Sequence, residues 1–256
     1  MDASELYDPE FRKLIKSKKQ TVIIPVGSLE QHGAHLPITT DSDIVTEIAS
    51  RLGKKCGFIV FPTISYRISY EHEPLFHSSI PEKVLLQTIL NLLKGFFAYD
   101  IVSVIFLNGH HGNVQALDKL LRLINPGMKE IKSNLRVMED QHSKKRGTYW
   151  TGNVNTRVYS YWEHMKHKFD HAGFVETSIM LAISDKVKMK KAKKGLMVEN
   201  LSKLEQSTIN KLSTQRGGFP QVAKNGVWCD PTKATKKDGE KFLAEIVRNL
   251  AKECQS

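Results

Sequence analysis

The chain has 256 residues, 40% of them hydrophobic, which suits one large domain with a substantial core, so we treat 1–256 as a single domain. Three widely spaced cysteines argue against a disulfide framework and against a thiolate zinc site. No apolar run approaches the roughly 20 residues of a membrane span, and the N-terminus lacks the apolar stretch of a signal peptide. The sequence therefore predicts a cytoplasmic protein without a membrane partner.

The formal charge is +11, from 38 basic and 27 acidic residues, which is large enough to attract nucleic acid or anionic substrates. Much of the excess lies in three lysine-rich stretches, at 16–19, 186–194 and 233–241. These stretches lack interleaved aromatic residues and are typical of solvated surface. Nucleic acid is therefore not favoured as a partner.

Short apolar runs rich in β-branched residues alternate with helical patterns along the chain. The runs are typical of strands buried on both faces and lie at 21–27, 57–64, 101–109 and 134–140. The helical patterns lie at 42–55, 81–97, 113–124, 175–184 and 237–253. Residues 141–170 break the alternation, and their polar and aromatic composition predicts a long functional loop or irregular strands. The alternation predicts a parallel sheet with right-handed crossovers, covered by helices on both faces.

Polar side chains that can bind metals or transfer protons follow each predicted strand. They are Glu30, His32, His35 and Asp41 after the first, Glu71 and His72 after the second, His110 and His111 after the third, and Glu139, Asp140 and His142 after the fourth. Ligands of an open parallel sheet collect outside the carboxyl ends of its strands. We therefore expect these side chains to converge at one edge of the sheet.

Carboxylate and imidazole groups without thiolates are typical ligands of a divalent ion of the Zn, Mn or Fe type. Glu30 and His32 point the same way if their segment is extended, because alternate residues share a face. Asp41 begins the next predicted helix, where a carboxylate is also a favourable cap, so this residue has a purely structural alternative. An aspartate able to bridge predicts two divalent metal ions per subunit, about 3.5–4 Å apart.

A mechanism follows from such a site. Two ions would lower the pKa of a shared water toward neutrality and polarise an amide carbonyl. Backbone N–H groups of the "NGHHGN" turn are candidates to stabilise the oxyanion. His171, or Glu176 if it is not a metal ligand, is the candidate to pass a proton to the leaving nitrogen. Gly27 and Gly33 are expected to let the backbone approach the metals closely.

Four motifs, in order over most of the chain, resemble the creatininase (creatinine amidohydrolase) family: "GSLEQHGAHLPITTD", "NGHHGN", "HAGFVETS" and "NGVWCDPTKAT". The resemblance implies a three-layer α/β/α sandwich with a mostly parallel central sheet, a binuclear metal centre, hydrolysis of a C–N amide bond, and a homohexamer. Glu30, His32, Asp41 and His110 match metal-ligand positions, with Asp41 as the bridge. His171 matches a residue that handles protons near the substrate.

The chain departs from creatininase at two motifs. The third-strand motif of creatininase resembles "NGHYEN", and its glutamate binds the second metal. At the position of that glutamate this chain has Gly112. Glu176, at the start of a predicted helix, is the candidate to replace that ligand, because a buried glutamate needs a cationic partner. The alternative is that Glu176 only caps its helix or pairs with a lysine. The second-strand motif reads "PLFHSS" where relatives commonly read "FPGT", so His77 and Ser78 alter a wall of the pocket.

The sequence thus predicts a metal-dependent amidohydrolase for a small cyclic amide or a formylamide. His171 and Glu176 are the predicted catalytic residues, and His72, His111 and Trp162 the predicted substrate contacts. The aromatic segment 148–162 is expected over the pocket or at a subunit contact, because its aromatic density exceeds what a solvated loop needs.

The alternative function is a basic nucleotide- or nucleic-acid-binding domain without catalysis. Its lysine clusters and aromatic residues would line one groove, and its binding would survive metal removal. A dinucleotide-binding fold is less favoured, because the first strand leads into "GSLEQHG" and not into a G-x-G-x-x-G turn.

Overall fold

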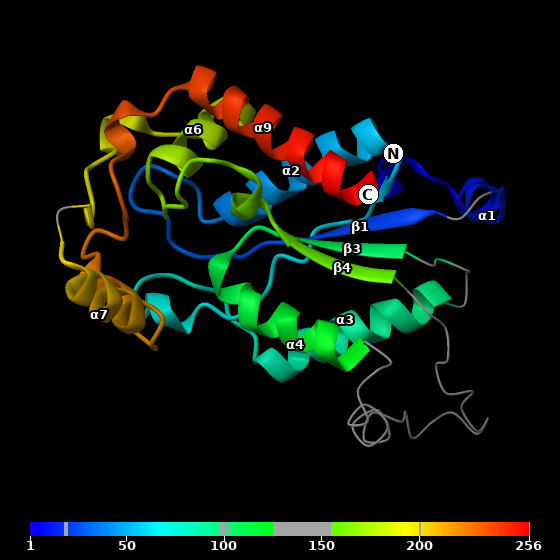
Figure 1. The fold of residues 1–256 in the computed structure, drawn as a ribbon, viewed down its shortest axis with the longest axis horizontal. Coiled ribbons are helices and arrows are strands. Elements are labelled where there is room, and N and C mark those ends of the chain that lie inside the picture. Colours follow the sequence, from blue (N-terminus) through cyan, green and yellow to red (C-terminus); the bar gives the residue numbers. More distant parts are fainter. Residues whose placement is uncertain (18–19, 98–100, 102, 125–154, 200, 256) are drawn as a thin grey trace.

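A four-stranded parallel sheet, in the order β2-β1-β3-β4, forms the middle of the molecule (Figure 1). The computed structural model describes residues 1–256 except 18–19, 98–100, 102, 125–154, 200 and 256. The strands are β1 (Thr21–Val26), β2 (Ile59–Val60), β3 (Ser103–Asn108) and β4 (Asn155–Ser160). Because all their pairings are parallel, the carboxyl ends of the strands meet at one edge of the sheet.

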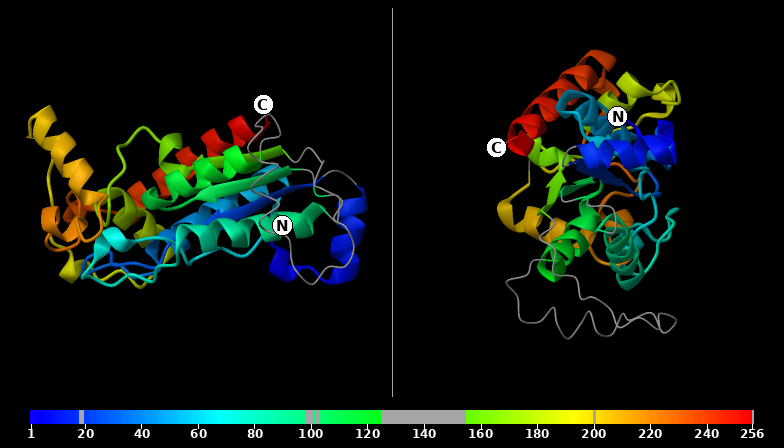
Figure 2. Two further views of the ribbon diagram at one scale, coloured as in Figure 1. Left: turned by 90° about the horizontal axis from the view of Figure 1, so that it is seen from below. Right: turned by 90° about the vertical axis from the view of Figure 1, so that its right-hand side faces the viewer.

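Helices cover both faces of the sheet (Figures 1 and 2). One face carries α2 (Thr40–Cys56), α6 (Phe174–Ile183) and α9 (Lys236–Gln255). The other carries α3 (Glu82–Phe97) and α4 (Val114–Ile124). The remaining helices are α1 (Asp8–Ser17), α7 (Lys203–Ser213) and α8 (Phe219–Val222). Short 3-10 helices are η1 (Ala3–Glu5), η2 (Tyr70–His72), η3 (His111–Asn113), η4 (Tyr161–His164), η5 (Met189–Lys191) and η6 (Pro231–Lys233).

The side chains of β1 alternate between two hydrophobic cores. Ile23 packs into the core formed with α2, α6 and α9, whereas Val22, Ile24 and Val26 pack into the core formed with α3 and α4. Each of these side chains is buried, and full burial of an aliphatic side chain contributes about 1.5–3 kcal/mol. A strand covered on both faces needs such a continuous apolar run, which is why the run was visible in the sequence.

The predicted three-layer α/β/α sandwich is confirmed, with differences in its strands. β2 is shorter than the predicted 57–64, although an isolated bridge joins Val26 to Ile64. Residues 155–160, within the predicted loop, form the regular parallel strand β4. β4 lies at the edge of the sheet and only Tyr159 and Ser160 are buried, so it lacks an apolar run. The predicted strand 134–140 lies outside the described residues.

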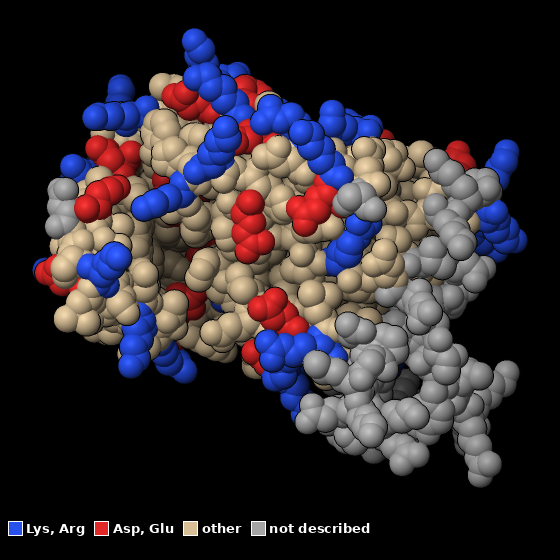
Figure 3. All heavy atoms as spheres, in the orientation of Figure 1, with Lys and Arg blue, Asp and Glu red and all other residues tan. Residues whose placement is uncertain are grey.

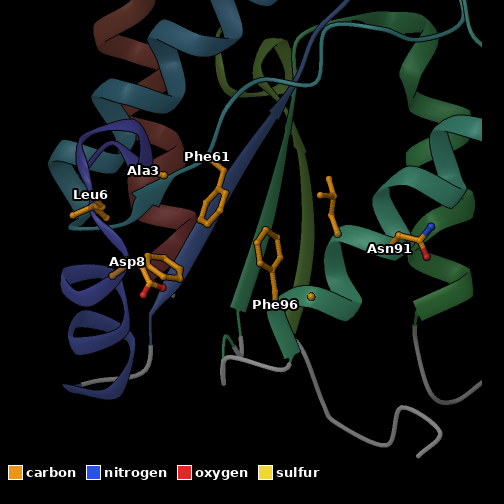
Figure 4. A pocket seen from close by; sticks show the side chains of 9 residues that line it. Ala3, Leu6, Asp8, Phe61, Asn91 and Phe96 are labelled. Atoms are coloured by element: carbon orange, nitrogen blue, oxygen red, sulfur yellow. The ribbon is translucent and has the colours of Figure 1, made fainter. Parts of the chain in front are cut away.

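A cavity of about 450 Å³ lies beside the end of α3, away from the carboxyl edge of the sheet (Figure 4). Apolar side chains dominate its lining, including Leu6, Phe11, Phe61 and Phe96. None of the predicted site residues lines it, so the candidate chemistry lies elsewhere. In the described parts of the chain, none of the helices combines the length and apolar character that crossing a membrane requires.

Candidate metal centre and active site

Two glycines let the N-terminus of α2 pack against the ends of β1 and β3. A Cβ on Gly27 would lie 2.6 Å from the Cα of Ser42, and one on Gly109 would lie 2.8 Å from the carbonyl oxygen of Asp41. No other residue type permits this approach, which brings Asp41, in the first turn of α2, to the carboxyl edge of the sheet. Gly27 thus serves helix packing, and its expected close approach to the metals stays a prediction.

An asparagine network shapes the turn after β3. The side-chain oxygen of Asn108 accepts hydrogen bonds from the backbone N–H of His110 at 3.0 Å and from the side chain of Asn113 at 3.1 Å. Asn113 also donates to the carbonyl oxygen of Gly27 at 3.2 Å. The turn is therefore tied to the end of β1, and His110 points into the same space as Asp41.

Three carboxylates and two imidazoles converge at this edge, all of them buried: Glu30, His32, Asp41, His110 and Glu176. The possible ligand atoms of Glu30, Asp41 and His110 lie within 4.8 Å of one another. Those of His32, Asp41 and Glu176 form a second such group. Asp41 belongs to both groups. The molecular surface is hollowed on this side, and acidic atoms are visible in the hollow (Figure 3).

The two oxygens of Asp41 face different histidines. Its Oδ2 lies 2.7 Å from Nδ1 of His110, and its Oδ1 lies 3.0 Å from Nε2 of His32. Nδ1 of His110 also lies 3.1 Å from Oε1 of Glu30, and Nε2 of His32 also lies 3.5 Å from Oε2 of Glu176. Each of these two nitrogens therefore faces two carboxylates, and an N–H group can donate well to only one of them.

The backbone assigns the tautomer of His32. Its Nδ1 lies 3.1 Å from the carbonyl oxygen of Glu30, which can only accept a hydrogen bond, so Nδ1 carries the proton. In the neutral ring, the lone pair of Nε2 then points at Asp41 and Glu176. That arrangement is unfavourable unless a cation lies between the nitrogen and the oxygens, and it is typical of metal-binding histidines. The residues present therefore fit a divalent ion.

The pKa values of the cluster show the same need for positive charge. Burial raises the pKa of Glu176 to about 8, and the charge of Asp41 adds to the shift. Burial would lower the pKa of His32, but Asp41 and Glu176 outweigh it and raise that pKa to about 10. Buried carboxylates held this close need a proton or a metal ion to compensate their charge.

Residues from the segment after β2 surround this cluster. Oε1 of Glu71 lies 3.4 Å from Nε2 of His110, so a carboxylate faces the ring nitrogen on the far side from Asp41. Nε2 of His72 lies 2.9 Å from Oε1 of Glu30, and Nδ1 of His72 accepts a hydrogen bond from the Gln31 amide at 3.0 Å. Such outer partners orient the ligands of metal sites. His72 is therefore placed between Glu30 and Gln31 as such an outer partner.

Two further groups meet the same 4.8 Å distance condition, Glu30 with His32 and His171, and Glu30 with Glu71 and His72. Both share Glu30 with the cluster described above. The donors available at this edge are therefore more numerous than the five predicted ligands, and shared residues link all four groups.

His171 stacks beside the cluster. Its ring centroid is 4.3 Å from that of His32 and 5.0 Å from that of His72, and its Nδ1 lies 3.9 Å from Oε1 of Glu30. Burial and the charges of His32 and His72 hold the pKa of His171 well below its ordinary value. The ring is therefore neutral at physiological pH, and one of its nitrogens carries a free lone pair.

The start of α6 places His171 and Glu176. The Asp170 carboxylate accepts the backbone N–H groups of Val175 at 2.8 Å and Glu176 at 3.3 Å, and so caps the helix. Oε2 of Glu176 in turn accepts the backbone N–H of Ala172 at 2.6 Å. The turn between Asp170 and Glu176 is thus held at both ends, and His171 lies within it.

Other predicted residues lie at the margin of the cluster or outside it. His111 is exposed, and its ring centroid lies 6.0 Å from that of Trp162 and 6.1 Å from that of Phe169. Trp162 is half-buried against the core. His35 donates to or accepts from the hydroxyl of Thr177 at 3.0 Å and belongs to none of the metal groups among the described residues. His142 lies outside the described residues, as does 148–154 of the predicted aromatic segment.

Two residues of this region had no role assigned from the sequence, Gln31 and Arg67, and Glu71 was named as a possible ligand or proton carrier without a specific role. The "EH" pair after the second strand was a usable signal for Glu71, because a carboxylate next to a histidine suits a ligand and its orienting partner. Gln31 and Arg67 carried no such signal. Their contacts depend on segments far away in the sequence.

A family model described as creatininase, creatinine amidohydrolase, matches residues 4–254. The chain belongs to the creatininase family. This creatininase-family protein is 31% identical over 238 residues to the mycofactocin precursor peptide peptidase of Mycolicibacterium smegmatis, covering 90% of this chain and 82% of that protein. It is 24% identical over 205 residues to the creatinine amidohydrolase of Pseudomonas putida, covering 70% of each chain.

Solved structures of creatininase share the fold of this creatininase-family protein. A manganese form superimposes with a TM-score of 0.74 at 20% sequence identity, covering 98% of this chain and 96% of that one. A form described as Zn-Zn type gives a TM-score of 0.73 at 21% identity, with the same coverage. Zinc and manganese thus occur in relatives with this fold, as the carboxylate and imidazole side chains led us to expect.

Membership of the family establishes the broad activity. This protein is a metal-dependent hydrolase that acts on C–N amide bonds. The predicted enzyme class is confirmed, and the alternative of a basic binding domain without catalysis is not supported.

Proposed function

We propose that this protein holds two divalent ions per chain and uses them to hydrolyse a small cyclic amide or a formylamide. One observation carries the proposal: the two oxygens of the buried Asp41 carboxylate each face a different histidine, His110 at 2.7 Å and His32 at 3.0 Å. A carboxylate placed in this way is suited to bridge two ions.

Glu30, Asp41 and His110 would hold the first ion, and His32, Asp41 and Glu176 would hold the second. Three protein ligands with room for water are typical of catalytic metal sites. Zinc, manganese and iron all suit these oxygen and nitrogen donors. When bound, such ions supply Lewis acidity to an amide carbonyl and acidify a water molecule.

Glu176 supplies the carboxylate that Gly112 lacks. Its side chain is fully buried, and Oε2 lies 3.5 Å from Nε2 of His32. Oε2 also accepts the N–H of Ala172, so Glu176 stabilises its own turn as well. Among the described residues, no lysine or arginine forms an ion pair with Glu176. These facts support a role as ligand more than a role in structure alone.

His171 transfers the proton. It is neutral at physiological pH because its pKa is held well below the ordinary value, and Nδ1 faces the cluster on the side of Glu30. A neutral imidazole in this place can take a proton from the attacking water and deliver it to the leaving nitrogen. Glu176 is then a ligand and not the proton carrier.

The substrate contacts come from the rim of the site. His111 follows the ligand His110 directly, and its ring lies near those of Trp162 and Phe169. We assign these three rings to one wall of the substrate site. His72, predicted as a substrate contact, is buried between Glu30 and Gln31, and we assign it to orienting Glu30. The homohexamer and the cytoplasmic location remain predictions, and light scattering would test the first.

The test is reconstitution of metal-stripped protein with Zn, Mn or Fe, followed by hydrolysis assays with creatinine, other cyclic amides, formylamides and short peptides. Peptides are included because 90% of this chain is similar to a peptidase. We expect hydrolysis to require metal and to saturate near two ions per chain. Saturation at one ion, with full turnover, would contradict the binuclear site. Hydrolysis of peptides alone would overturn the small-amide assignment.

A further inference from the structure

Arg67 is the largest fully buried side chain in the described residues, and it lies in the segment between β2 and η2. Its side chain is 1% exposed. Its carbonyl oxygen accepts the N–H of Ile80 at 2.8 Å, and the hydroxyl of Ser79 accepts the N–H of Ser69 at 2.9 Å. The backbone that carries Arg67 is therefore held in place before any ligand binds.

The guanidinium of Arg67 is poorly matched by protein groups. Its nearest carboxylate oxygen is Oε1 of Glu71, 3.7 Å from NH2, which is longer than a hydrogen bond. Within the described residues, Nε and NH1 are buried without any hydrogen-bond partner. A buried charge with unsatisfied donors is strongly unfavourable, so this arrangement calls for an additional ligand.

Gly112 makes room for this guanidinium next to the metal cluster. A Cβ on Gly112 would touch NH1 of Arg67, lie 2.6 Å from NH2, and lie 2.8 Å from Nε2 of His110. Any other residue at position 112 would therefore collide with both Arg67 and the candidate ligand His110. Because Gly112 is exposed, the guanidinium lies close beneath the surface at the edge of the site.

We propose that Arg67 recognises an anionic group, a carboxylate or a phosphate, on the substrate of this enzyme. The planar guanidinium offers paired N–H donors that match the oxygens of either group. The inference rests on the proposed function in one respect: two divalent ions balance the charges of the four carboxylates of Glu30, Asp41, Glu176 and Glu71, so that the charge of Arg67 leaves the site with one positive charge in excess. A substrate with one anionic group then restores the balance. Arg67 is a specificity-determining residue and takes no part in bond cleavage.

The test compares matched ligands by calorimetry on zinc-reconstituted protein. N-formylglycine is paired with N-formylglycinamide for the carboxylate, and N-formyl-O-phosphoethanolamine with N-formylethanolamine for the phosphate. For wild type we expect the anionic member of at least one pair to bind 10-fold tighter or more, and the pair that shows the preference identifies the group. In Arg67→Met the ratio of the affinities for the anionic and the neutral member should fall to near 1. The affinity for the neutral member itself should change less than twofold.

Two further variants keep the test decisive. Arg67→Lys retains the charge but not the paired donors, so it should keep an intermediate preference even if Arg67→Met loses stability. Arg216→Met is the matched control, because Arg216 pairs with Glu73 at 2.8 Å on the exposed surface, and it should leave the preference unchanged.

Several results would overturn the proposal. Equal affinity for both members of each pair in wild type would do so, and so would failure of all four ligands to bind at millimolar concentration. A preference that persists in Arg67→Met would show that the metal ions, and not Arg67, select the anion. Amide hydrolysis without anion preference would leave the proposed function intact. An anion preference without any metal-dependent hydrolysis would leave Arg67 as a recognition residue and remove the function.

Discussion

Nδ1 of His110 lies 2.7 Å from Oδ2 of Asp41, although the two residues are 69 positions apart in the sequence. The parallel pairing of β1 with β3 sets Val26 level with Asn108, so the loops after the two strands leave the sheet side by side. Asp41 then enters from the first turn of α2, where the helix dipole favours a negative charge. The Asp41 carboxylate thus belongs to both candidate metal groups.

Asp41→Ala should remove both metal ions. One carboxylate serves both candidate groups, so its loss leaves two protein ligands for each ion. We expect fewer than about 0.2 ions per chain by elemental analysis, against about two in wild type, and no measurable turnover. The matched control is Asp43→Ala on the same helix, whose carboxylate accepts from the Thr39 hydroxyl at 2.8 Å. Full metal content in Asp41→Ala would contradict the shared bridge.

Glu176→Gln should make one of the two ions labile. The change keeps the size of the side chain and removes the charge that faces His32. We expect one ion to be lost on dialysis against a weak chelator and turnover to fall by about 100-fold, with the fold unchanged by circular dichroism. Glu163→Gln, at an exposed glutamate, should behave as wild type. Two tightly held ions in Glu176→Gln would show that Glu176 carries protons or stabilises the turn.

Metal binding should release protons. In protein stripped by chelation, the pKa of His32 is raised to about 10 and that of Glu176 to about 8, so both hold a proton at pH 7 and must lose it to bind an ion. Apparent metal affinity should therefore rise steeply as the pH increases to about 8 and less steeply toward 10. Calorimetry in two buffers of different ionisation enthalpy counts the protons released at pH 7. Release of none, or affinity that falls with rising pH, would refute this assignment.

Gln31→Met should slow catalysis without removing the metals. The Gln31 amide lies 3.0 Å from His72 and 3.1 Å from His171, and its oxygen accepts the N–H of Gly33 at 3.0 Å. Loss of these contacts frees both rings while leaving every proposed ligand in place. We expect turnover to fall about 10- to 100-fold at unchanged metal content. Wild-type turnover would show that packing alone orients the two rings.

Gly226→Ala provides an independent way to disturb the same amide. A Cβ there would lie 2.6 Å from Cδ of Gln31, and the φ of Gly226 is +71°, which also disfavours alanine. We expect a loss of turnover similar to that of Gln31→Met, together with a small drop in melting temperature. Gly57→Ala is the control, because Gly57 also has a positive φ of +73° but a Cβ there would meet nothing within 4 Å. It should lower the melting temperature without changing turnover.

The sequence by itself determined the layered architecture and the type of site. Apolar runs indicate strands buried on both faces, because such strands need a continuous hydrophobic sequence. The runs that correspond to β1 and β3 are clear in the sequence. Glu30, His32 and Asp41 are also close together in the chain, so their spacing alone suggested ligands. The edge strand β4 was missed because an edge strand with few buried side chains needs no apolar run.

Only the tertiary structure decided which atoms meet. The distance of 3.5 Å between Glu176 and His32 depends on how α6 packs against the loop after β1, and no periodicity records it. The place of Arg67 beneath Gly112 depends likewise on two loops that approach without regular pairing. Local sequence patterns reflect local burial, whereas contacts between distant segments depend on the packing of the whole chain. For this reason the tautomer of His32, the contacts of His72 and the burial of the Arg67 charge could be found only from the fold.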